Sequence, residues 1–451
     1  MPGNQKRSDM TLSLKKYYPS YPAYQDSGVA WIGKIPEGWK TKKMKYIGQI
    51  SLGKMLQNEN TGTDHLRPYL RAQNILWERV DVSDVRDMWF SPDELQKHRI
   101  RKNDLLVSEG GEVGRTALWD ESVKECFVQN SINRISLFKD HEAKYVLYQF
   151  EAFGKGKIFE SIVNQVSIAH LTRDKLKEIS FILPEHNVQQ AIASYLDSKT
   201  ALIDQIITRK HRLIELLQEK RAAIINQAVT RGLNTAVEMK LINVAWLEEI
   251  PKRWSVQKLK HVAKAIVGFA FNSDDYIHDG IPLIRIGNIR PDGTIAIEDA
   301  KRLPLHYLDT YRFVRVDRGA LLMAMTGATI GKVGKYLFEQ PGLLNQRVCK
   351  FLPVSIDERY LRYILKSDRY FEYIKLIGFG GAQPNISDAQ LLDYFVAIPP
   401  LTEQQEIASN LDSKTALIDQ AIQKIEDSIA CLTEFRSSLI SHVVTGKVKV
   451  A

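Results

Sequence analysis

Apolar residues recur every seven positions over two long stretches of the chain, and this spacing predicts two long helices. The first stripe is Leu196, Ile203, Leu217 and Ile224, and the second is Leu411, Ile418, Ile425, Leu432 and Leu439. A second row, Ile207 with Ile214 and Ile422 with Ile429, widens each stripe. Each helix would span about 43 residues, on the order of 65 Å at 1.5 Å per residue. A helix that long cannot bury its stripe on a compact domain, so we expect the two helices to pack along each other. A duplication with pseudo-twofold symmetry would make this pairing antiparallel and would place two globular parts at opposite ends of a rod.

Both predicted helices carry signals for their ends. Their starts have the spacing of a capping box, in which side chains satisfy free backbone amides: Asn187 with Gln190, and Thr402 with Gln405. Gly232 and Gly446 predict the helix stops.

Charge favours the pairing of these two helices with each other. Residues 186 to 231 hold seven Lys and Arg against four Asp and Glu, whereas residues 401 to 446 hold three against seven. Opposite net charges favour mutual pairing over pairing with a second copy. Lys210 interrupts the first stripe where Ile425 continues the second, which makes it a candidate register-setting or partner-facing position.

The helical text is part of an internal duplication. Residues 192 to 205 (IASYLDSKTALIDQ) recur at 407 to 420 with a single change, Tyr195 to Asn410. The same 215-residue shift places Trp31 on Trp246 and Trp39 on Trp254, and we expect these four tryptophans to be core anchors at the entrance of each copy.

About 150 residues in each copy consist of short apolar runs broken by Gly, Asn, Asp and Pro, which predicts strands and loops with a few helices. Three matched pieces keep a common skeleton: 68 to 75 with 282 to 289, 104 to 115 with 319 to 332, and 144 to 150 with 359 to 365. The text between them diverges. We therefore expect two α/β (α+β) domains that share one fold and present two different surfaces.

Composition narrows the partners. The 451 residues carry a formal net charge of +9 and a pI near 9.1, which favours a polyanionic partner. Cys126, Cys349 and Cys431 lie far apart, so we expect small buried thiols in a reduced cytoplasmic chain rather than a zinc site. Charged residues interrupt the apolar stretches near the start of the sequence, so we expect no signal peptide there. No apolar run approaches the roughly 18 residues of a membrane span.

Three catalytic patterns are incomplete in this sequence. An amino-methyltransferase needs Asn or Asp before Pro-Pro and an aromatic residue, but the only Pro-Pro, at 399 to 400, lies between Ile398 and Leu401. GATIGK, at 327 to 332, has one residue too few for a phosphate-binding loop and lacks the hydroxyl residue after it. Asp292, Asp299 and Lys301 fit a loose nuclease pattern, but the matching positions Glu78, Val85 and Asp87 do not repeat it. We expect no catalytic and no metal-binding residues.

Nucleic acid is the polyanion that the positive charge favours, and recognition of DNA would call for Arg, Lys, Asn and Gln on loops, because these side chains form bidentate contacts with base edges. The candidates in the first copy are Lys54, Arg71, Gln73, Asn74, Arg79, Arg115 and Gln129, and those in the second are Arg285, Asn288, Arg290, Lys332, Asn345, Gln346 and Arg347. Arg71 with Arg285 and Asn74 with Asn288 are shared between copies, so we expect them to contact phosphates or to hold the scaffold. Unshared residues such as Lys54 and Arg79 are the better candidates for base readout.

Residues 21 to 39, 183 to 233 and 398 to 420 closely resemble specificity subunits of type I restriction-modification enzymes. The resemblance spans the whole chain. It implies an N-terminal arm at 1–30, a target recognition domain at 31–184, a spacer helix at 185–233, a second recognition domain at 234–399, a second spacer helix at 400–446 and a tail at 447–451.

In that family each recognition domain reads one half of a split, asymmetric DNA sequence, and the helices set the gap between the halves. The helices also dock two methylation subunits, which carry S-adenosylmethionine chemistry, and restriction subunits add ATP- and Mg-dependent translocation and cleavage. The resemblance therefore implies a non-catalytic reader of double-stranded DNA with no cofactor of its own.

A competing class is a protein-only scaffold, in which the long helices are the functional element and the globular parts bind other proteins. A sequence-dependent footprint on duplex DNA separates the two classes, because a scaffold would give none.

Overall fold

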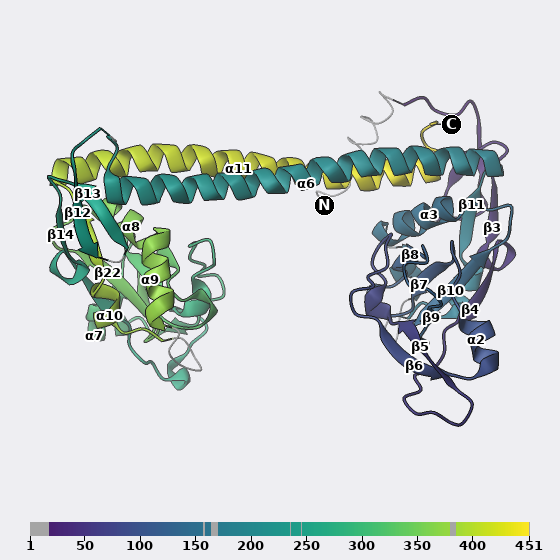
Figure 1. The fold of residues 1–451 in the computed structure, drawn as a ribbon, viewed down its shortest axis with the longest axis horizontal. Helices are drawn as coiled ribbons and strands as arrows, with labels where there is room; N and C mark the ends of the chain where they lie inside the picture. The colour runs from purple at the N-terminus through teal and green to yellow at the C-terminus, as the bar shows by residue number, and fades with distance from the viewer. Residues whose placement is uncertain are drawn as a thin grey trace. The chain divides into compact units, whose positions relative to one another are not determined.

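The structure, a computed structural model, describes residues 18–156, 158–163, 170–234, 236–244, 246–378 and 385–450. The first 17 residues of the predicted N-terminal arm lie outside this part. The chain divides into two compact units: unit 1 is Met1–Lys210 with Glu426–Ala451, and unit 2 is His211–Ile425. Each unit combines one α+β domain with a section of two long helices, α6 (His186–Arg231) and α11 (Leu401–Val444), which both units share (Figure 1).

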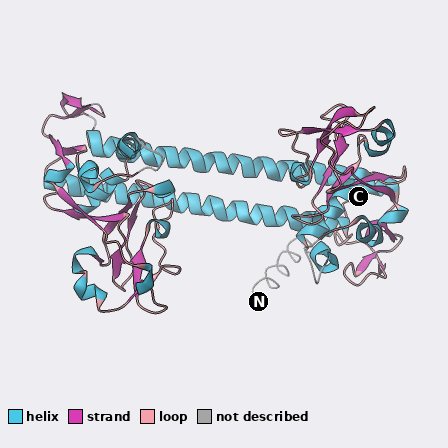
Figure 2. Cartoon of the chain, turned by 90° about the horizontal axis from the view of Figure 1, so that it is seen from below, coloured by secondary structure: helices cyan, strands magenta, loops and turns pink. Residues whose placement is uncertain are grey.

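The two long helices run along each other (Figure 2), and the core residues that they share show that they pack antiparallel within each unit, as predicted. In unit 1 the start of α6, with Leu196 and Ile203, shares a core with the end of α11, including Leu439. In unit 2 the end of α6, with Val229, shares a core with Leu411 near the start of α11. The predicted fold class is confirmed.

The seven-residue stripes face inward. Every residue of the two stripes and of the two widening rows is buried or half-buried. The large apolar residues that stay exposed on the helices lie at other positions: Leu202, Ile206, Leu213 and Leu216 on α6, and Leu401 and Leu417 on α11.

The predicted capping boxes are wrong. The helices begin at His186 and Leu401, so Asn187 and Thr402 lie inside the first turn. A different glutamine holds the start of each helix, one residue before the predicted Gln190 or Gln405. The Gln189 and Gln404 side chains donate to the carbonyls of Pro184 and Pro399, both at 2.9 Å. The predicted stops are confirmed, because Gly232 and Gly446 follow the helix ends with φ of 78° and 68°, angles that glycine adopts without steric cost.

The described residues of unit 1 form four small sheets. Its strands pair in the orders β1-β2, β3-β11, β4-β10-β7-β8 and β6-β5-β9. Their bounds are β1 Tyr24–Asp26, β2 Lys34–Pro36, β3 Lys40–Lys43, β4 Gly48–Leu52, β5 His65–Leu70, β6 Arg86–Phe90, β7 Leu105–Ser108, β8 Thr116–Leu118, β9 Phe127–Val128, β10 Ile132–Leu137 and β11 Ser180–Leu183. The helices are α2 Pro92–His98, α3 Ala143–Lys155, α4 Ile158–Val163 and α5 Arg173–Glu178, with 3-10 turns η1 Met44–Tyr46 and η2 Ala72–Asn74.

Unit 2 repeats this plan, with orders β12-β13, β14-β23, β15-β22-β19-β20 and β17-β16-β21-β18. Its strands are β12 Met239–Val244, β13 Leu247–Pro251, β14 Ser255–Lys258, β15 Ala263–Val267, β16 Ile281–Ile284, β17 Arg302–Leu303, β18 Arg315–Val316, β19 Leu321–Ala324, β20 Val333–Lys335, β21 Gly342–Leu344, β22 Val348–Pro353 and β23 Phe395–Ile398. Its helices are α7 Tyr307–Thr310, α8 Glu358–Leu365, α9 Asp368–Gly378 and α10 Asp388–Leu392, with turns η3 Leu259–His261, η4 Ser273–Asp275, η5 Ile286–Asn288, η6 Arg312–Val314 and η7 Gly327–Thr329.

The repeat extends to strand register. Arg134 of β10 lies opposite Leu106, and Lys350 of β22 lies opposite Leu322, so corresponding residues in this sheet are 216 apart. The core sits between the sheets, the shorter helices and the ends of α6 and α11 in each unit.

Trp39 and Trp254 are buried, as the sequence predicts, while Trp31 and Trp246 are half-buried against Phe153 and Tyr394. Burial raises the pKa of the Cys126 thiol to about 12, and Cys349 is also buried. Cys431 is exposed, so its predicted burial is wrong: it lies on the side of α11 away from the core. No helix within the described ranges is long and apolar enough to cross a membrane.

Candidate DNA-reading loops and helix junctions

Asn74 and Asn288, shared between the copies, fold the same turn in each unit. The Asn74 side chain accepts from the Arg71 amide at 2.8 Å and donates to the Asp81 carbonyl at 2.9 Å. Asn288 accepts from the Arg285 amide at 2.9 Å and donates to the Ala296 carbonyl at 3.0 Å. Both asparagines are buried, so their side chains satisfy backbone groups of the loop, which is the scaffold role expected for shared residues.

Three further candidates of unit 1 meet around this turn. An Arg71 guanidinium nitrogen lies 2.6 Å from an Asp84 carboxylate oxygen, and Gln73 donates to the same oxygen at 3.3 Å. Arg115 donates to the Ala72 carbonyl at 2.8 Å. Arg79, close by in sequence, is exposed. The turn is therefore a fixed platform with an exposed arginine beside it.

Lys54 and Gln129 form a second group, where the end of β4 passes the end of β9. Lys54 is buried, and its ammonium binds the Glu94 carboxylate and the Gln57 side-chain carbonyl. Gly53 permits this close passage, because a Cβ there would collide with the carbonyl oxygens of Val128 and Gln129. Gly268 plays the same part in unit 2, against Leu344 and Asn345. Base readout by Lys54 stays a prediction. It requires the ammonium to leave the Glu94 carboxylate and to bind a DNA base instead.

The unit 2 candidates are grouped in the same way. Asn345 pairs with Phe269 as Gln129 pairs with Lys54, and exposed Gln346 follows it. Exposed Arg347 donates to the Asn385 side chain at 3.1 Å. The remaining two are Lys332, whose ammonium lies 4.9 Å from the Phe371 ring centre, and Arg290, which is exposed.

A tyrosine at corresponding positions of the two copies bonds each domain to a long helix, α6 in unit 1 and α11 in unit 2. The Tyr148 hydroxyl donates to Asp197 of α6 at 2.9 Å, and the Tyr363 hydroxyl donates to Asp412 of α11 at 2.7 Å. Both aspartates belong to the repeated text and also bind a cation of the domain, Lys144 in unit 1 and Arg362 in unit 2.

A second tyrosine ties each domain to the other long helix. Tyr145 donates to the Val444 carbonyl near the end of α11, and Tyr360 donates to the Val229 carbonyl near the end of α6, both at 3.2 Å. Both tyrosines are fully buried. Each domain is thus fixed to two antiparallel helices at once, which limits its rotation about either of them.

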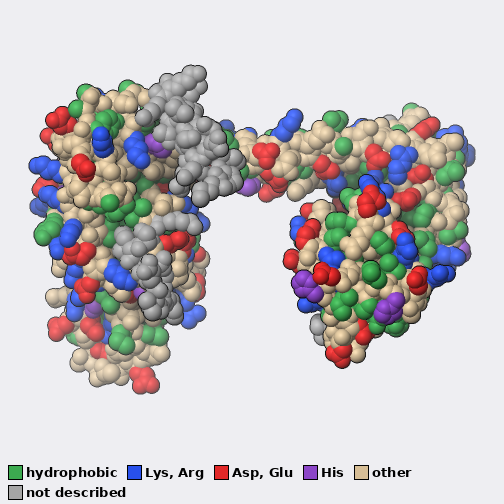
Figure 3. Space-filling model, turned by 180° about the vertical axis from the view of Figure 1, so that it is seen from behind, with side chains coloured by type: hydrophobic (Ala, Val, Ile, Leu, Met, Phe, Trp, Pro, Cys, Tyr) green, Lys and Arg blue, Asp and Glu red, His purple; other side chains and the backbone are tan. Residues whose placement is uncertain are grey.

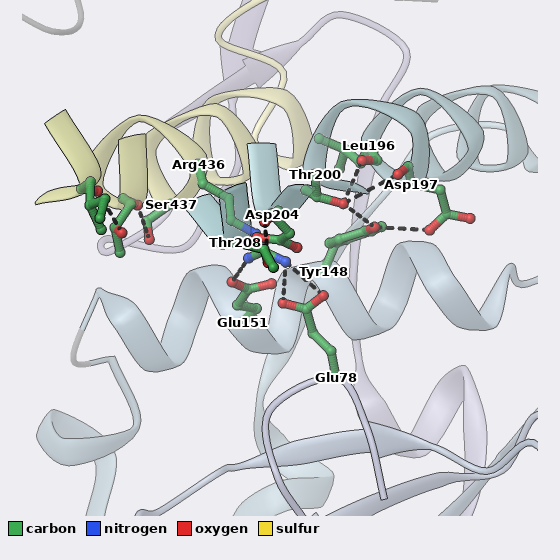
Figure 4. A network of polar contacts seen from close by, with 12 residues as sticks. Glu78, Tyr148, Glu151, Leu196, Asp197, Thr200, Asp204, Thr208, Arg436 and Ser437 are labelled. Carbon is green, nitrogen blue, oxygen red and sulfur yellow. Dashed lines mark hydrogen bonds and ion pairs between the residues drawn. The ribbon is translucent and has the colours of Figure 1, made fainter. Parts of the chain in front are cut away.

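Arg436 of α11 binds three carboxylates in unit 1 (Figure 4). Its nitrogens lie 2.6 Å from Glu78, 2.7 Å from Glu151 and 3.0 Å from Asp204 of α6. Glu151 is buried, and one of its oxygens has no hydrogen-bond partner among the described residues. Burial raises the pKa of Glu151, the Glu78 charge adds to the rise, and Arg436 opposes it.

Among the described residues, unit 2 keeps the helix-to-helix ion pair of this cluster. Arg221 of α6 lies 3.1 Å from Asp419 of α11, and these two are the 215-residue counterparts of Arg436 and Asp204. Lys366 takes the place of Glu151. Burial lowers the pKa of Lys366, and the charge of Arg221 lowers it further. The two units therefore share the helix pair and differ in the charge that the domain adds.

Sequence reasoning missed these junctions. The sequence carries a signal for them, since Asp204, Arg221, Asp419 and Arg436 all follow the 215-residue shift, but the total charge of each helix does not reveal which residues pair. Sequence reasoning also missed the Arg101, Arg134 and Arg173 cluster described below, because nothing in the sequence places α2, β10 and α5 together.

Elsewhere the two signs of charge are mixed. On the face drawn in Figure 3, basic and acidic side chains alternate in both units rather than forming one large basic patch. No group of three or more His, Cys, Asp or Glu side chains suited to a metal ion lies within the described part of the chain.

Comparison with known proteins agrees with this architecture. A family model described as the type I restriction modification DNA specificity domain matches residues 36–216 and 251–427, once in each copy. The type I restriction enzyme MjaVIII specificity subunit of Methanocaldococcus jannaschii is 26% identical over 432 residues, covering 92% of this chain and 94% of that protein.

Two solved structures share the fold. One, from work on complex assembly and conformational transition of the type I R-M system, has a TM-score of 0.68 at 14% identity and covers 91% of this chain and 98% of its own. The HsdS subunit from Thermoanaerobacter tengcongensis has a TM-score of 0.52 at 13% identity and covers 92% and 98%. With both copies matched by the family model over most of their length, the chain belongs to the type I restriction-modification DNA specificity family.

Proposed function

We propose that this chain is the DNA sequence-specificity subunit of a type I restriction-modification complex. Each domain reads one half of a split, asymmetric target in double-stranded DNA, and α6 and α11 set the gap between the halves. The chain carries no catalytic step of its own. S-adenosylmethionine belongs to the methylation subunits, and ATP and Mg belong to the restriction subunits, all in the cytoplasm.

One observation carries this proposal: the contacts between domain and helix are the same in the two units, whereas the residues of the candidate reading loops differ. Tyr148 with Asp197 and Tyr363 with Asp412 repeat the same contact on repeated text. At the reading loops, by contrast, Lys54 of unit 1 stands where Phe269 stands in unit 2. Two equally mounted domains with different loop chemistry are what recognition of two different half-sites requires.

The exposed apolar positions of α6 support the docking of partner subunits. Leu202, Ile206, Leu213 and Leu216 are 43 to 51% exposed, although the inward stripe is covered. Their spacing places them along one side of the helix. Exposed leucines in a row on a long helix are suited to packing against helices of a partner, and we assign this surface to methylation subunits.

Sequencing of adenine methylation in the host genome, with and without this gene, tests the proposal. We expect a two-part motif with a fixed gap to be methylated only when the gene is present. Methylation that is unchanged by removal of the gene would refute the proposal.

A further inference from the structure

A groove lined by five basic side chains lies beside β4 in unit 1. Lys97 and His98 come from the end of α2, Arg101 from the turn after it, Arg134 from β10 and Arg173 from the start of α5. The groove has a volume of about 630 Å³, and its other lining residues are uncharged. Neither aspartate nor glutamate is among the lining residues.

Most of this positive charge is uncompensated. Lys97 and Arg101 are exposed and form no ion pair with residues in the described ranges. Arg173 lies 3.9 Å from its own neighbour, Asp174, which is exposed. Arg134 donates to the Arg99 carbonyl, and its Nε is 4.0 Å from Asp104. Asp104 is buried beneath the groove, where its carboxylate accepts from Ser136 and from the Arg101 amide.

His98 contributes a nearly buried ring to the groove. Its side chain is only 9% exposed, it lines the groove, and its Nδ1 has no hydrogen-bond partner among the described residues. A buried ring nitrogen without a partner is costly. Burial lowers the pKa of His98. An anion in the groove would favour the protonated ring, which can donate to it, and would give a counter-charge to the four cations around it.

The groove continues into the candidate reading loops. Gly53 lines it, and Lys54, the next residue, binds Glu94 of the same helix that supplies Lys97 and His98. Lys54 in turn pairs with Gln129. In protein–DNA interfaces, phosphate contacts flank base contacts and fix their register. A cationic groove next to Lys54 and Gln129 has the position that such a phosphate contact needs.

Unit 2 does not repeat the groove. The residues 216 positions after Lys97, His98 and Arg101 are Phe313, Val314 and Asp317. The counterpart of Arg173, 215 positions on, is Asp388. Only the cation of β10 is kept, since Lys350 donates to the Arg315 carbonyl as Arg134 donates to that of Arg99. Exposed Phe313 instead faces an aromatic cluster with Phe269 and Tyr311.

We propose that the groove of Lys97, His98, Arg101, Arg134 and Arg173 binds backbone phosphate of duplex DNA beside the half-site of unit 1, and that unit 2 makes no equivalent contact. Guanidinium and ammonium groups bind phosphate oxygens through charge-assisted hydrogen bonds. The proposal rests on the proposed function and makes the two half-sites unequal in their dependence on salt.

The test compares DNA affinity across a series of salt concentrations for the chain assembled with its methylation subunits, on a duplex that carries the methylated motif. Each phosphate contact contributes roughly 0.9 to the slope of log affinity against log salt. We expect Lys97→Ala with Arg101→Ala to reduce that slope by about one to two and to weaken binding, while preference for the motif is retained.

Two matched variants isolate the groove. Lys97→Arg with Arg101→Lys keeps its charge and should keep the slope. Lys124→Ala with Lys139→Ala removes the same charge from exposed positions of unit 1 outside the groove and should also keep it.

If the Lys97→Ala, Arg101→Ala variant has the same slope of log affinity against log salt as the unaltered chain, the inference is overturned. A loss of methylation-subunit binding with the slope unchanged would also overturn it, because the groove would then be a protein contact. Failure of the unaltered chain to prefer the motif would instead count against the proposed function, so the two failures are distinguishable.

Discussion

Arg436 of α11 holds Asp204 of α6 at 3.0 Å, and the same pair recurs as Arg221 with Asp419 at 3.1 Å. The duplication thus preserved one antiparallel register between the helices in both units. The two arginines differ in their surroundings, because Arg436 is 13% exposed and binds two further carboxylates, whereas Arg221 is 33% exposed.

This difference predicts unequal costs of removing the two arginines. Arg436→Ala leaves Glu151 buried without its cation, and we expect a loss of about 3–5 kcal/mol in the stability of unit 1. Arg221→Ala removes a more exposed pair and should cost about 0–1 kcal/mol. Denaturant unfolding with hydrogen exchange resolved by unit measures both.

At pH values where the Glu151 carboxyl is ionised, adding Glu151→Gln to Arg436→Ala should recover part of the loss, because it removes the unpaired charge. Equal costs for the two arginines, or no recovery in the double variant, would contradict this account of the cluster.

Glu151 also predicts a pH dependence. Burial, together with the Glu78 charge, raises its pKa in the folded chain above the ordinary 4.5. The folded state then holds this proton more tightly than the unfolded state, so its contribution to stability is complete below pH 4.5 and is lost as pH rises through the folded pKa. Melting temperatures of the unaltered chain and of Glu151→Gln, measured from about pH 5 to about pH 8, should diverge in favour of the variant. Parallel curves would show that the carboxyl does not titrate in this range.

Gly53 and Gly268 predict matched steric effects. A Cβ at either position collides with backbone carbonyls of the neighbouring strand end, which cannot move aside as a flexible side chain can. We expect Gly53→Ala and Gly268→Ala each to cost about 1–3 kcal/mol. Gly287→Ala is the control, since nothing lies within 4 Å of a Cβ there. Thermal unfolding of the three variants tests this, and a tolerated Gly53→Ala would mean that the strand ends are not so closely packed.

Substitutions of Asn74 and Arg79 should distinguish a residue that holds the loop structure from one that recognises DNA bases. Asn74→Ala removes three side-chain hydrogen bonds within a buried turn, so we expect lower stability of unit 1 and weaker binding to all DNA sequences. Arg79→Ala should leave stability unchanged and relax recognition at one position of the half-site by about 1–3 kcal/mol. Affinity for duplexes varied at single positions measures the effect. If Arg79→Ala discriminates between DNA sequences as well as the unaltered chain does, Arg79 is not part of the reading surface.

Much of the architecture followed from local pattern. The inward stripes, for example Leu196 and Leu411, could be predicted because heptad spacing is a property of the helix itself. The capping boxes failed because Gln189 and Gln404 reach prolines before the helix, a contact that depends on how the chain enters it. The sequence predicted that Asn74 and Asn288 contact phosphates or hold the scaffold, and in the structure their side chains bond backbone groups of the turn.

The charge clusters could not be predicted from spacing alone. Glu78, Glu151 and Arg436 meet only because a loop, α3 and α11 converge in three dimensions. Lys54 looked suited to base readout because it is an unshared cation. Its burial against Glu94 depends on where α2 lies, which no residue near Lys54 encodes.

Exchanging residues 40 to 183 for those of another family member tests whether each domain reads its own half-site. The junctions suit this exchange, because Lys40 and Leu183 lie opposite each other on the paired strands β3 and β11. Genome-wide sequencing of methylated adenine should then show one half of the motif replaced, with the other half and the gap retained. An unchanged motif with methylation intact would contradict the account.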